Sequence, residues 1–321
     1  MYIVTGGAGF IGSNIVKGLN DIGIDDILVV DNLKNSEKFR NLVGLRFSQY
    51  MDKQDLLDFL ATDEDLELDG IIHQGACSDT TERDGRYMME NNYNYTRCLA
   101  QWCIANSTPF VYASSASVYG NGKNGFKEDF ANEAPINIYA YSKYLFDQWA
   151  RNWFDDVETT FVGLRYFNVY GPNEAHKCKM ASMAFHGFNQ LAATGKIKLF
   201  RGVDGVADGD QRRDFVFVKD VVDVVLHFAL EGLSKKRKTT QGVFNVGTGV
   251  ARSFRELAEA VIAANGKGGE IEYIPFPDEL RGQYQNYTQA DLTALRKAGY
   301  KAKFTSLEDG VSEYVTELEK D

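Results

Sequence analysis

Three glycines spaced as Gly6-x-x-Gly9-x-x-Gly12 stand between a stretch typical of a strand and a stretch typical of a helix. The apolar run Tyr2–Thr5 precedes them, and the amphipathic run Phe10–Asn20 follows them. Glycines in this context let the backbone turn tightly and approach a pyrophosphate, which the amides and dipole of the helix N-terminus attract. The sequence therefore predicts that the chain opens with a strand–turn–helix unit that binds a dinucleotide.

The ribose contact of such a unit is expected about 20 residues further on, at the end of the second strand. Asp31 ends the second apolar run of the chain. An acidic residue there favours the free ribose hydroxyls of NAD, whereas Lys34, Lys38 and Arg40 can neutralise the 2′-phosphate of NADP. Asn32 tolerates either group. From these residues alone, NAD and NADP remain equally favoured.

Composition excludes several other classes of protein. The 321 residues are 44% hydrophobic and 25% charged, which is ordinary for a soluble globular protein with a large core. A net charge of −10 argues against a general nucleic-acid binder. No apolar run of about 18 residues occurs, so we expect no membrane span. The four cysteines and four histidines lack metal-ligand spacing, so we expect no metal and reduced thiols.

The strand expected at Tyr2 leaves no room ahead of it for a signal peptide, and a cytoplasmic protein is therefore expected. In the first half, apolar runs alternate with helical patterns at 52–60 and 86–104. The expected strands are Tyr2–Thr5, Ile27–Val30, Gly70–His73, Phe110–Ala113 and Thr160–Leu164. Near-continuous apolar strands separated by helices indicate a parallel sheet covered on both faces. We predict an α/β fold with a doubly wound parallel (Rossmann) sheet.

After Asn168 the pattern loosens, and we expect a second, smaller α/β lobe that binds substrate. Residues 1–167 plus about 215–246 would form the dinucleotide-binding domain, and residues 168–214 plus about 247–321 the substrate domain. The Gly- and Asp-rich segment Gly202–Gln211 and the basic segment Ser234–Thr240 are interpreted as surface loops. The first lacks the register of a calcium loop.

Tyr139 and Lys143 are four residues apart in a helical stretch, which places them on one helix face. A free phenol, with a pKa of about 10, is a poor base at neutral pH. A nearby ammonium favours the phenolate, so we expect Lys143 to lower the pKa of Tyr139. A dinucleotide fold with such a pair indicates an enzyme that moves a hydride.

Two further segments follow expected strands, at the sheet edge where ligands bind. The segment Ala113–Gly120 carries several hydroxyls, and Ser115 is placed to hydrogen-bond an oxygen that is being oxidised. The segment Gln74–Ser78 offers small residues beside a cofactor.

Together the motifs TGGAGFIG, SSASVYG, YxxxK and RYFNVYGP resemble the extended short-chain dehydrogenases/reductases that act on nucleotide sugars, over nearly the whole chain. The resemblance implies a catalytic triad of Ser115, Tyr139 and Lys143, in which Tyr139 exchanges a proton with a sugar hydroxyl. The 4,6-dehydratases of the family carry an Asp-Glu pair directly after the Ser/Thr. Here Ala116 and Ser117 stand in those positions, so dehydration lacks its carboxylates.

Later segments resemble one branch of this family, the epimerases that invert C6 of an ADP-linked heptose for the lipopolysaccharide inner core. They are Asn173–Lys177, Met180–His186, Arg212–Val216, Tyr273–Pro277 and Gln283–Leu292, with Met88–Tyr93 and Tyr50–Lys53 earlier. The resemblance implies transient oxidation to a 6-keto sugar, a turn of the ketone and re-reduction on the opposite face. It also implies Lys177 as a second base, although context alone favours a solvated loop lysine. As a base, Lys177 requires a lowered pKa.

The resemblance also carries over binding positions. The cofactor positions are Gly6, Gly9, Phe10, Ile11, Gly12, Asp31, Asn32, Lys38, Lys53, Gln74, Gly75, Ala76, Cys77, Ser78, Asn91, Lys143, Val169 and Lys177. The substrate positions are Asn168, Lys179, His186, Phe200, Arg201, Gly202, Val203, Arg213 and Tyr284. Arg213 is the candidate for the diphosphate, which a guanidinium grips with two hydrogen bonds.

The branch resembled uses NADP, which favours NADP over NAD, and assembles into homo-oligomers. The chain departs from it at Lys179, where a small hydroxyl residue is usual, and in the longer segment Gly202–Gln211. Two alternative functions stay open. A UDP-hexose 4-epimerase, or another nucleotide-sugar dehydrogenase of this family, would not need Lys177. A sensor that only binds the dinucleotide would tend to lose Tyr139 or Lys143.

Overall fold

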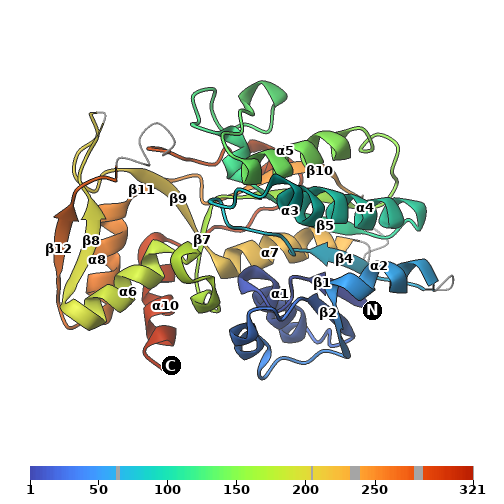
Figure 1. The fold of residues 1–321 in the computed structure, drawn as a ribbon, viewed down its shortest axis with the longest axis horizontal. Helices are drawn as coiled ribbons and strands as arrows, with labels where there is room; N and C mark the ends of the chain where they lie inside the picture. Colours follow the sequence, from blue (N-terminus) through green and yellow to red (C-terminus); the bar gives the residue numbers. More distant parts are fainter. Residues whose placement is uncertain (63–65, 204, 232–238, 278–284, 321) are drawn as a thin grey trace.

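Seven strands form one parallel sheet in the computed structural model, which describes residues 1–62, 66–203, 205–231, 239–277 and 285–320 (Figure 1). Every neighbouring pair in this sheet is parallel. In order across the sheet the strands are β10 (Gln241–Val246), β6 (Phe161–Tyr166), β5 (Phe110–Ser115), β4 (Gly70–His73), β1 (Tyr2–Thr5), β2 (Ile27–Asp31) and β3 (Gln49–Asp52). The predicted doubly wound sheet is confirmed, together with the expected apolar strands.

The edge strand β3 is absent from the sequence prediction. Among the described strands it pairs with β2 alone, and its first two residues, Gln49 and Tyr50, are exposed. An edge strand with one open side needs no continuous apolar run, so the pattern used to find its neighbours does not mark it.

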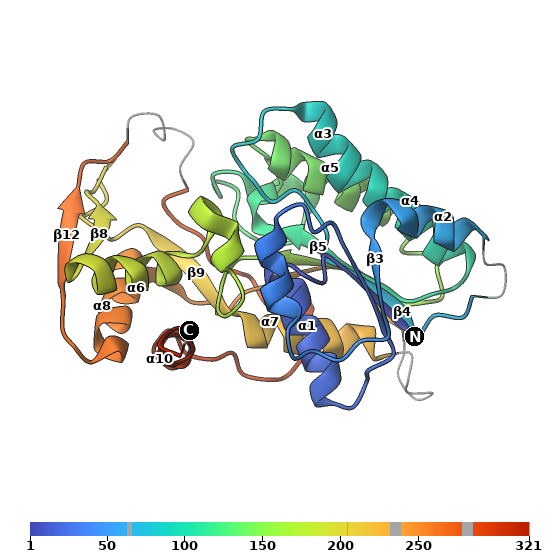
Figure 2. The same ribbon diagram turned by 60° about the horizontal axis from the view of Figure 1, so that its bottom comes forward.

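Helices cover both faces of the sheet. On one face lie α1 (Phe10–Asp21) and α7 (Val218–Ala229), and their apolar side chains share a core cluster with β1, β2 and β6 (Figure 2). On the other face lie α2 (Lys53–Thr62), α4 (Tyr95–Ala105) and α5 (Ile138–Arg151), which share a second cluster with β4 and β5. Burial on both sides explains the near-continuous apolar strands.

The expected helix over 86–104 is interrupted. It consists of α3 (Gly85–Met89), a π-helical turn over Glu90–Asn94 and α4. π-Helical turns often occur at functional sites. The turn carries Asn91 and Asn92, both of which act in the site described below.

A smaller lobe extends from one end of the sheet (Figure 1). Its strands are β7 (Asn168–Tyr170), β9 (Arg212–Phe217) and β11 (Ala251–Ser253) in one sheet, and β8 (Lys196–Phe200) with β12 (Glu270–Ile274) in another. Its helices are α6 (Met183–Thr194), α8 (Phe254–Asn265) and α10 (Leu307–Leu318), while α9 (Thr293–Lys297) packs against β10. Within the segment 215–246, α7 packs on the main sheet and β10 pairs with its strand β6. In contrast, β9 pairs with β7 and β11 in the smaller lobe. Each helix in the described part of the chain is too short or too polar to span a lipid bilayer.

The order of the strands determines where a ligand binds. The chain runs outward from β1 to β2 and β3, then returns to the other side of β1 to add β4, β5, β6 and β10. In such sheets a crevice opens beyond the carboxyl ends of the strands, next to the point where the order reverses. The glycine turn after β1 and the segment after β4 therefore lie at the expected binding edge.

Candidate active site

A cavity of about 1060 Å³ lies at this edge, between the main sheet and the smaller lobe. It is lined by residues from both parts. Every predicted catalytic and cofactor position contributes to its lining, as do the substrate positions Asn168 and Lys179. Residues that are far apart in sequence thus line one pocket. Gly6 and Lys177, for example, are about 170 residues apart.

The glycine turn is packed so closely that side chains do not fit in it. A Cβ on Gly12 would lie 2.1 Å from the carbonyl oxygen of Gly6. Gly6 has a φ of +66°, and a Cβ there would lie 2.7 Å from the Gly75 amide nitrogen. Gly9 caps α1, and Phe10, Ile11 and Gly12 follow in its first turn along the cavity. The backbone amides at a helix N-terminus thus line the cavity, which is the arrangement that fits a pyrophosphate.

Beyond the glycine turn, Asp31 is already paired. Its carboxylate accepts a hydrogen bond from the Ala8 amide at 2.9 Å and another from the Lys38 ammonium, and the side chain is buried. Lys34 and Lys53 line the same part of the cavity. The Lys53 ammonium is close enough to Asp52, Lys34 and Asp31 to feel their charges. Three ammonium groups therefore lie near the two carboxylates of Asp31 and Asp52, a balance that suits an additional anionic group on the ligand.

The segment after β4 is held by the π-helical turn. Asn92, which is buried, accepts from the Cys77 amide at 2.8 Å and donates to the Cys77 carbonyl at 2.9 Å. It also donates to the Ser142 hydroxyl of α5 at 3.1 Å. The neighbouring Asn91 accepts a hydrogen bond from Lys53. One turn therefore fixes the segment Gln74–Ser78 relative to the helix that carries the Tyr/Lys pair.

Tyr139 and Lys143 both lie on α5 and line the cavity. The helix begins where the Asn137 side chain accepts a hydrogen bond from the Ala140 amide at 2.8 Å. The Lys143 ammonium donates to the Ala113 carbonyl at 2.8 Å, and burial lowers its pKa to about 8. The two side chains thus share a helix face, as the four-residue spacing predicts.

The expected lowering of the Tyr139 pKa is not observed. Burial raises the pKa of Tyr139, and a hydrogen bond with Ser115 lowers it only in part. Removal from water disfavours the phenolate. The Lys143 ammonium is directed to a carbonyl of β5 and does not contribute to the shift. The prediction was wrong because sequence spacing places two residues on one face without showing where the amine points.

Ser115 lies at the end of β5, where it caps a 3₁₀ turn over Ala116–Tyr119. Its hydroxyl accepts hydrogen bonds from the Ser117 amide at 3.2 Å and from the Ser117 hydroxyl at 2.9 Å. These contacts occupy its lone pairs and leave its proton available to Tyr139 or to a ligand oxygen.

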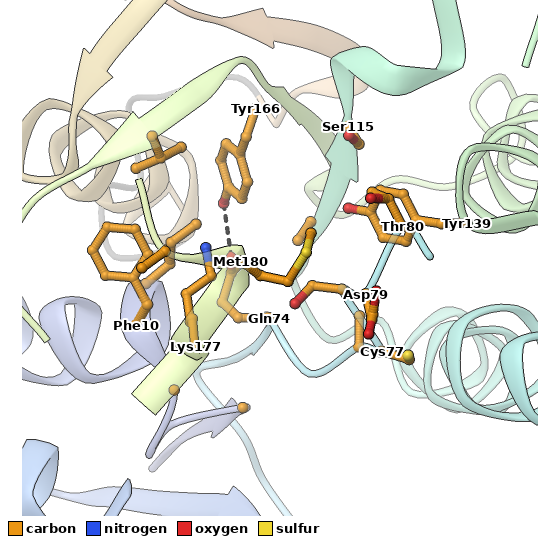
Figure 3. Close-up of a pocket in the computed structure, with 18 of the residues that line it drawn as sticks. Phe10, Gln74, Cys77, Asp79, Thr80, Ser115, Tyr139, Tyr166, Lys177 and Met180 are labelled. Atoms are coloured by element: carbon orange, nitrogen blue, oxygen red, sulfur yellow. Dashed lines mark hydrogen bonds between the residues drawn. The ribbon is translucent and has the colours of Figure 1, made fainter. Parts of the chain in front are cut away.

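Lys177 lies in a 3₁₀ segment, Ala175–Met180. Glu174, directly before this segment, accepts hydrogen bonds from Ser182, which follows it. Its ammonium nitrogen lies 5.2 Å from the centre of the Phe10 ring. Burial lowers the pKa of Lys177, and the Glu174 carboxylate opposes that shift. The direction is the one a general base needs. In Figure 3, Lys177 and Tyr139 lie on different sides of the cavity, with Met180 between them.

Other predicted substrate positions lie away from the described lining. His186 is on α6, next to Phe185, and Phe200 ends β8 with its ring against Phe276. Arg213 is buried, donates to the Arg212 carbonyl at 2.9 Å and lies over the ring of Phe254, which itself lines the cavity. Arg201, Gly202 and Val203 lie in the turn after β8. Tyr284 and most of the Ser234–Thr240 segment fall outside the described residues.

The cavity also contains residues that the sequence analysis did not single out. Asp79 and Thr80 directly continue the Gln74–Ser78 segment, and Figure 3 shows Thr80 on the Tyr139 side. Tyr166 belongs to the RYFN motif, and its hydroxyl donates to Gln74 at 2.9 Å. Asp79 and Thr80 directly follow a segment that the sequence analysis singled out, and Tyr166 lies within one of its motifs. This proximity could have identified all three residues from the sequence.

Comparison with known proteins agrees with this geometry. Residues 2–247 match the model of the NAD dependent epimerase/dehydratase family. The chain belongs to this family. Membership and the glycine turn together indicate a nicotinamide cofactor.

Similar proteins match the chain over nearly its whole length. The chain is 53% identical to the ADP-L-glycero-D-manno-heptose-6-epimerase of Brachyspira hyodysenteriae, over 100% of this chain and 98% of the relative. The crystal structure of the Helicobacter pylori ADP-L-glycero-D-manno-heptose-6-epimerase is 31% identical with a TM-score of 0.82, covering 100% and 96%. The UDP-glucose 4-epimerase of Thermotoga maritima, solved with UDP-glucose, is 25% identical with a TM-score of 0.81, covering 99% and 98%.

Proposed function

We propose that this protein epimerises ADP-D-glycero-β-D-manno-heptose at C6 to the L-glycero form, a step towards the lipopolysaccharide inner core. The observation that carries the proposal is that Tyr139 and Lys177 lie on different sides of one cavity. Inversion at a carbon that passes through a ketone needs an acid/base group for each orientation of the oxygen. Identity of 53% over the full length of a relative of this name supports the choice of sugar.

In this proposal the bound nicotinamide supplies oxidation of C6 and its later re-reduction. Tyr139 takes the proton of the hydroxyl in one orientation, assisted by the Ser115 hydroxyl. Lys177 gives or takes the proton in the other orientation. Burial lowers the pKa of Lys177, which favours the neutral amine that can accept a proton, and raises the pKa of Tyr139, which favours the protonated phenol that can donate one. Lys143 keeps its place beneath the cofactor site through the Ala113 carbonyl.

We infer that the cofactor is NADP, with NAD as the alternative. Lys34, Lys38 and Lys53 line the cavity with Asp31, and they outnumber the nearby carboxylates of Asp31 and Asp52. Asp31 is neutralised by Lys38 and by the Ala8 amide, so it does not repel a 2′-phosphate as a free carboxylate would. Asn32, within 3.4 Å of the Lys38 ammonium, adds an amide donor.

For the substrate we propose that Asn168 and Lys179, which line the cavity, contact the sugar or its diphosphate. Arg213 lies behind Phe254, one layer from the cavity, and we retain it as the candidate for the diphosphate. His186, Phe200, Arg201, Gly202, Val203 and Tyr284 remain proposed substrate positions.

The test is to supply the purified protein with ADP-D-glycero-β-D-manno-heptose and, separately, with UDP-galactose, and to determine product stereochemistry by NMR. We expect inversion at C6 of the ADP-heptose and slow or absent turnover of the UDP-hexose. The 4-epimerase alternative rests on the fold shared with the Thermotoga enzyme, and preferential turnover of UDP-galactose would favour it. Binding of cofactor without turnover of either sugar would favour a sensor.

Two broader inferences accompany the function. The described cysteines, Cys77, Cys98, Cys103 and Cys178, are free thiols, which suits a reducing cytoplasm. We also propose that the protein forms a homo-oligomer, which light scattering of the purified protein would test.

A further inference from the structure

The cavity contains a buried amide donor without a partner. Gln74 follows β4, and its backbone amide donates to the Thr5 carbonyl at 3.0 Å, which holds it at the point where the strand order reverses. The Gln74 side-chain nitrogen is buried, yet it has no hydrogen-bond partner among the residues that the structure describes. A buried donor left without an acceptor destabilises the folded protein. Such a group in a ligand cavity calls for an explanation.

The orientation of this amide is set by Tyr166. The Tyr166 hydroxyl donates to the Gln74 side-chain oxygen at 2.9 Å (Figure 3). Burial raises the pKa of Tyr166, so the hydroxyl stays protonated and continues to donate. Because Tyr166 occupies the oxygen of the amide, the nitrogen is the end left for another acceptor.

The amide lies apart from the Ser115 hydroxyl in the cavity (Figure 3). In the view of Figure 3, Gln74 and Tyr166 lie between Lys177 and Tyr139, nearer to Lys177. On the Tyr139 side, the Ser115 hydroxyl is a hydrogen-bond partner of the phenol. On the other side, Lys177 has the apolar Phe10 ring beside it, and Gln74 and Tyr166 supply polar atoms.

We propose, on the basis of the proposed epimerase function, that the Gln74 amide donates to the reacting sugar oxygen when that oxygen faces Lys177. Gln74 would thus be the counterpart of Ser115, and Tyr166 would be a positioning residue that orients the amide. A neutral N–H donates equally to a hydroxyl oxygen and to a ketone oxygen, so it serves the oxygen throughout the reaction. It also stabilises the negative charge that develops on the oxygen as hydride arrives at C6.

The proton and electron balance of this half of the reaction is simple. In reduction, C6 of the ketone gains the hydride carried by the reduced nicotinamide, and the oxygen gains a proton from the Lys177 ammonium. Oxidation is the reverse, with neutral Lys177 accepting the proton. Gln74 exchanges no proton and no electrons in either direction.

The experiment compares the two epimers. Each variant is mixed with ADP-D-glycero-heptose and, in a separate reaction, with ADP-L-glycero-heptose. The single-turnover rate at which each sugar reduces the bound nicotinamide is measured from the absorbance at 340 nm. Gln74→Met keeps the approximate volume and removes the donor. We expect it to slow oxidation of one epimer by about 10²–10³-fold, the effect of removing an oxyanion donor, and to leave the other epimer nearly unchanged. Gln101→Met, on the exposed side of α4, is the matched control.

Several outcomes decide the matter. Equal slowing of both epimers by Gln74→Met indicates a general structural role and overturns the proposal, as does an unchanged rate for both. Should Gln74→Met fail to fold, Gln74→Leu, which also removes the donor without adding a charge, takes its place with the same expectation. Tyr166→Phe should slow the same epimer to a smaller extent. Wild-type protein that oxidises neither epimer contradicts the proposed function instead, so the two failures are distinguishable.

Discussion

The carboxylate of Glu174 accepts hydrogen bonds from the Ser182 amide at 2.5 Å and from the Ser182 hydroxyl at 2.6 Å. Glu174 is fully buried. The contact joins two residues that are eight positions apart, so it closes the loop 174–182, which carries Lys177. It also ties this loop to the start of α6, where the Ser182 hydroxyl accepts a hydrogen bond from the Phe185 amide. The position of the proposed second base therefore depends on a buried carboxylate that is not among the described lining residues of the cavity.

Replacing Glu174 by Gln should affect both the position and the proton affinity of Lys177. The Glu174 charge raises the pKa of Lys177, so the neutral amide should lower that pKa further. We expect the limb of the pH–rate profile that reports Lys177 to move to lower pH. Loosening of the loop should reduce kcat by about 10-fold to 100-fold. Glu37→Gln, an exposed carboxylate, is the control, and an identical pH profile in both variants would contradict the link.

Tyr139→Phe and Lys177→Met should each abolish most of the epimerisation. Loss of one acid/base group lowers rates by about 10²–10⁴-fold. Neither change alters the glycine turn, so the nicotinamide should remain bound at wild-type stoichiometry. The measurements are the initial rate of product formation and the absorbance of the bound cofactor. Full activity in either variant would remove that residue from the mechanism.

Lys38→Ala should change the choice of cofactor. The variant leaves the Asp31 carboxylate with only the Ala8 amide and removes one of three ammonium groups near the ribose. A charge-assisted hydrogen bond contributes about 1.5–3 kcal/mol. We therefore expect affinity for NADP to fall roughly 10-fold to 100-fold, with affinity for NAD unchanged or higher. Calorimetry with both nucleotides tests this, with Lys17→Ala on the exposed side of α1 as the control.

Lys143 should make the stability of the protein depend on pH in the alkaline range. Its pKa is lowered from 10.5 to about 8 by burial, so between those values the unfolded chain binds the proton and the folded protein does not. The contribution of Lys143 to the free energy of unfolding therefore increases as the pH rises from 8 to 10.5. This added stability is lost as the pH falls back through 8. The full difference is about 3 kcal/mol. Urea unfolding of wild type and Lys143→Met across this range isolates the contribution, and a constant difference would refute it.

Arg165→Met should destabilise the fold more than any exposed charge change. The Arg165 guanidinium is fully buried and donates to Asp147 at 2.8 and 2.9 Å and to Tyr119 at 3.0 Å, with Glu133 as a further partner at 2.5 Å. Removing one partner from a buried ion pair costs about 3–5 kcal/mol because the other charge stays buried. Arg40→Met, whose pair with Glu37 is exposed, should cost at most about 1 kcal/mol. Urea midpoints of both variants provide the comparison.

The glycine turn, the apolar strands and the Tyr139/Lys143 spacing were determined by the sequence itself. Each is a local property, since backbone conformation, alternation of burial and helical periodicity act within about a dozen residues. The same holds for Ser115, which directly follows an apolar strand. Motif resemblance added the distant Lys177, which lines the cavity that the structure shows.

Only the tertiary structure decided how those local pieces meet. The pKa of Tyr139 is raised rather than lowered, because its burial and the direction of the Lys143 amine depend on elements far away in sequence. The placement of β9 outside the main sheet comes from its pairing with β7. The Gln74 amide nitrogen, which has no partner among the described residues, is likewise visible only in the folded protein. Pattern in a sequence marks which side of an element is buried, whereas packing decides which groups that side touches and at what distance.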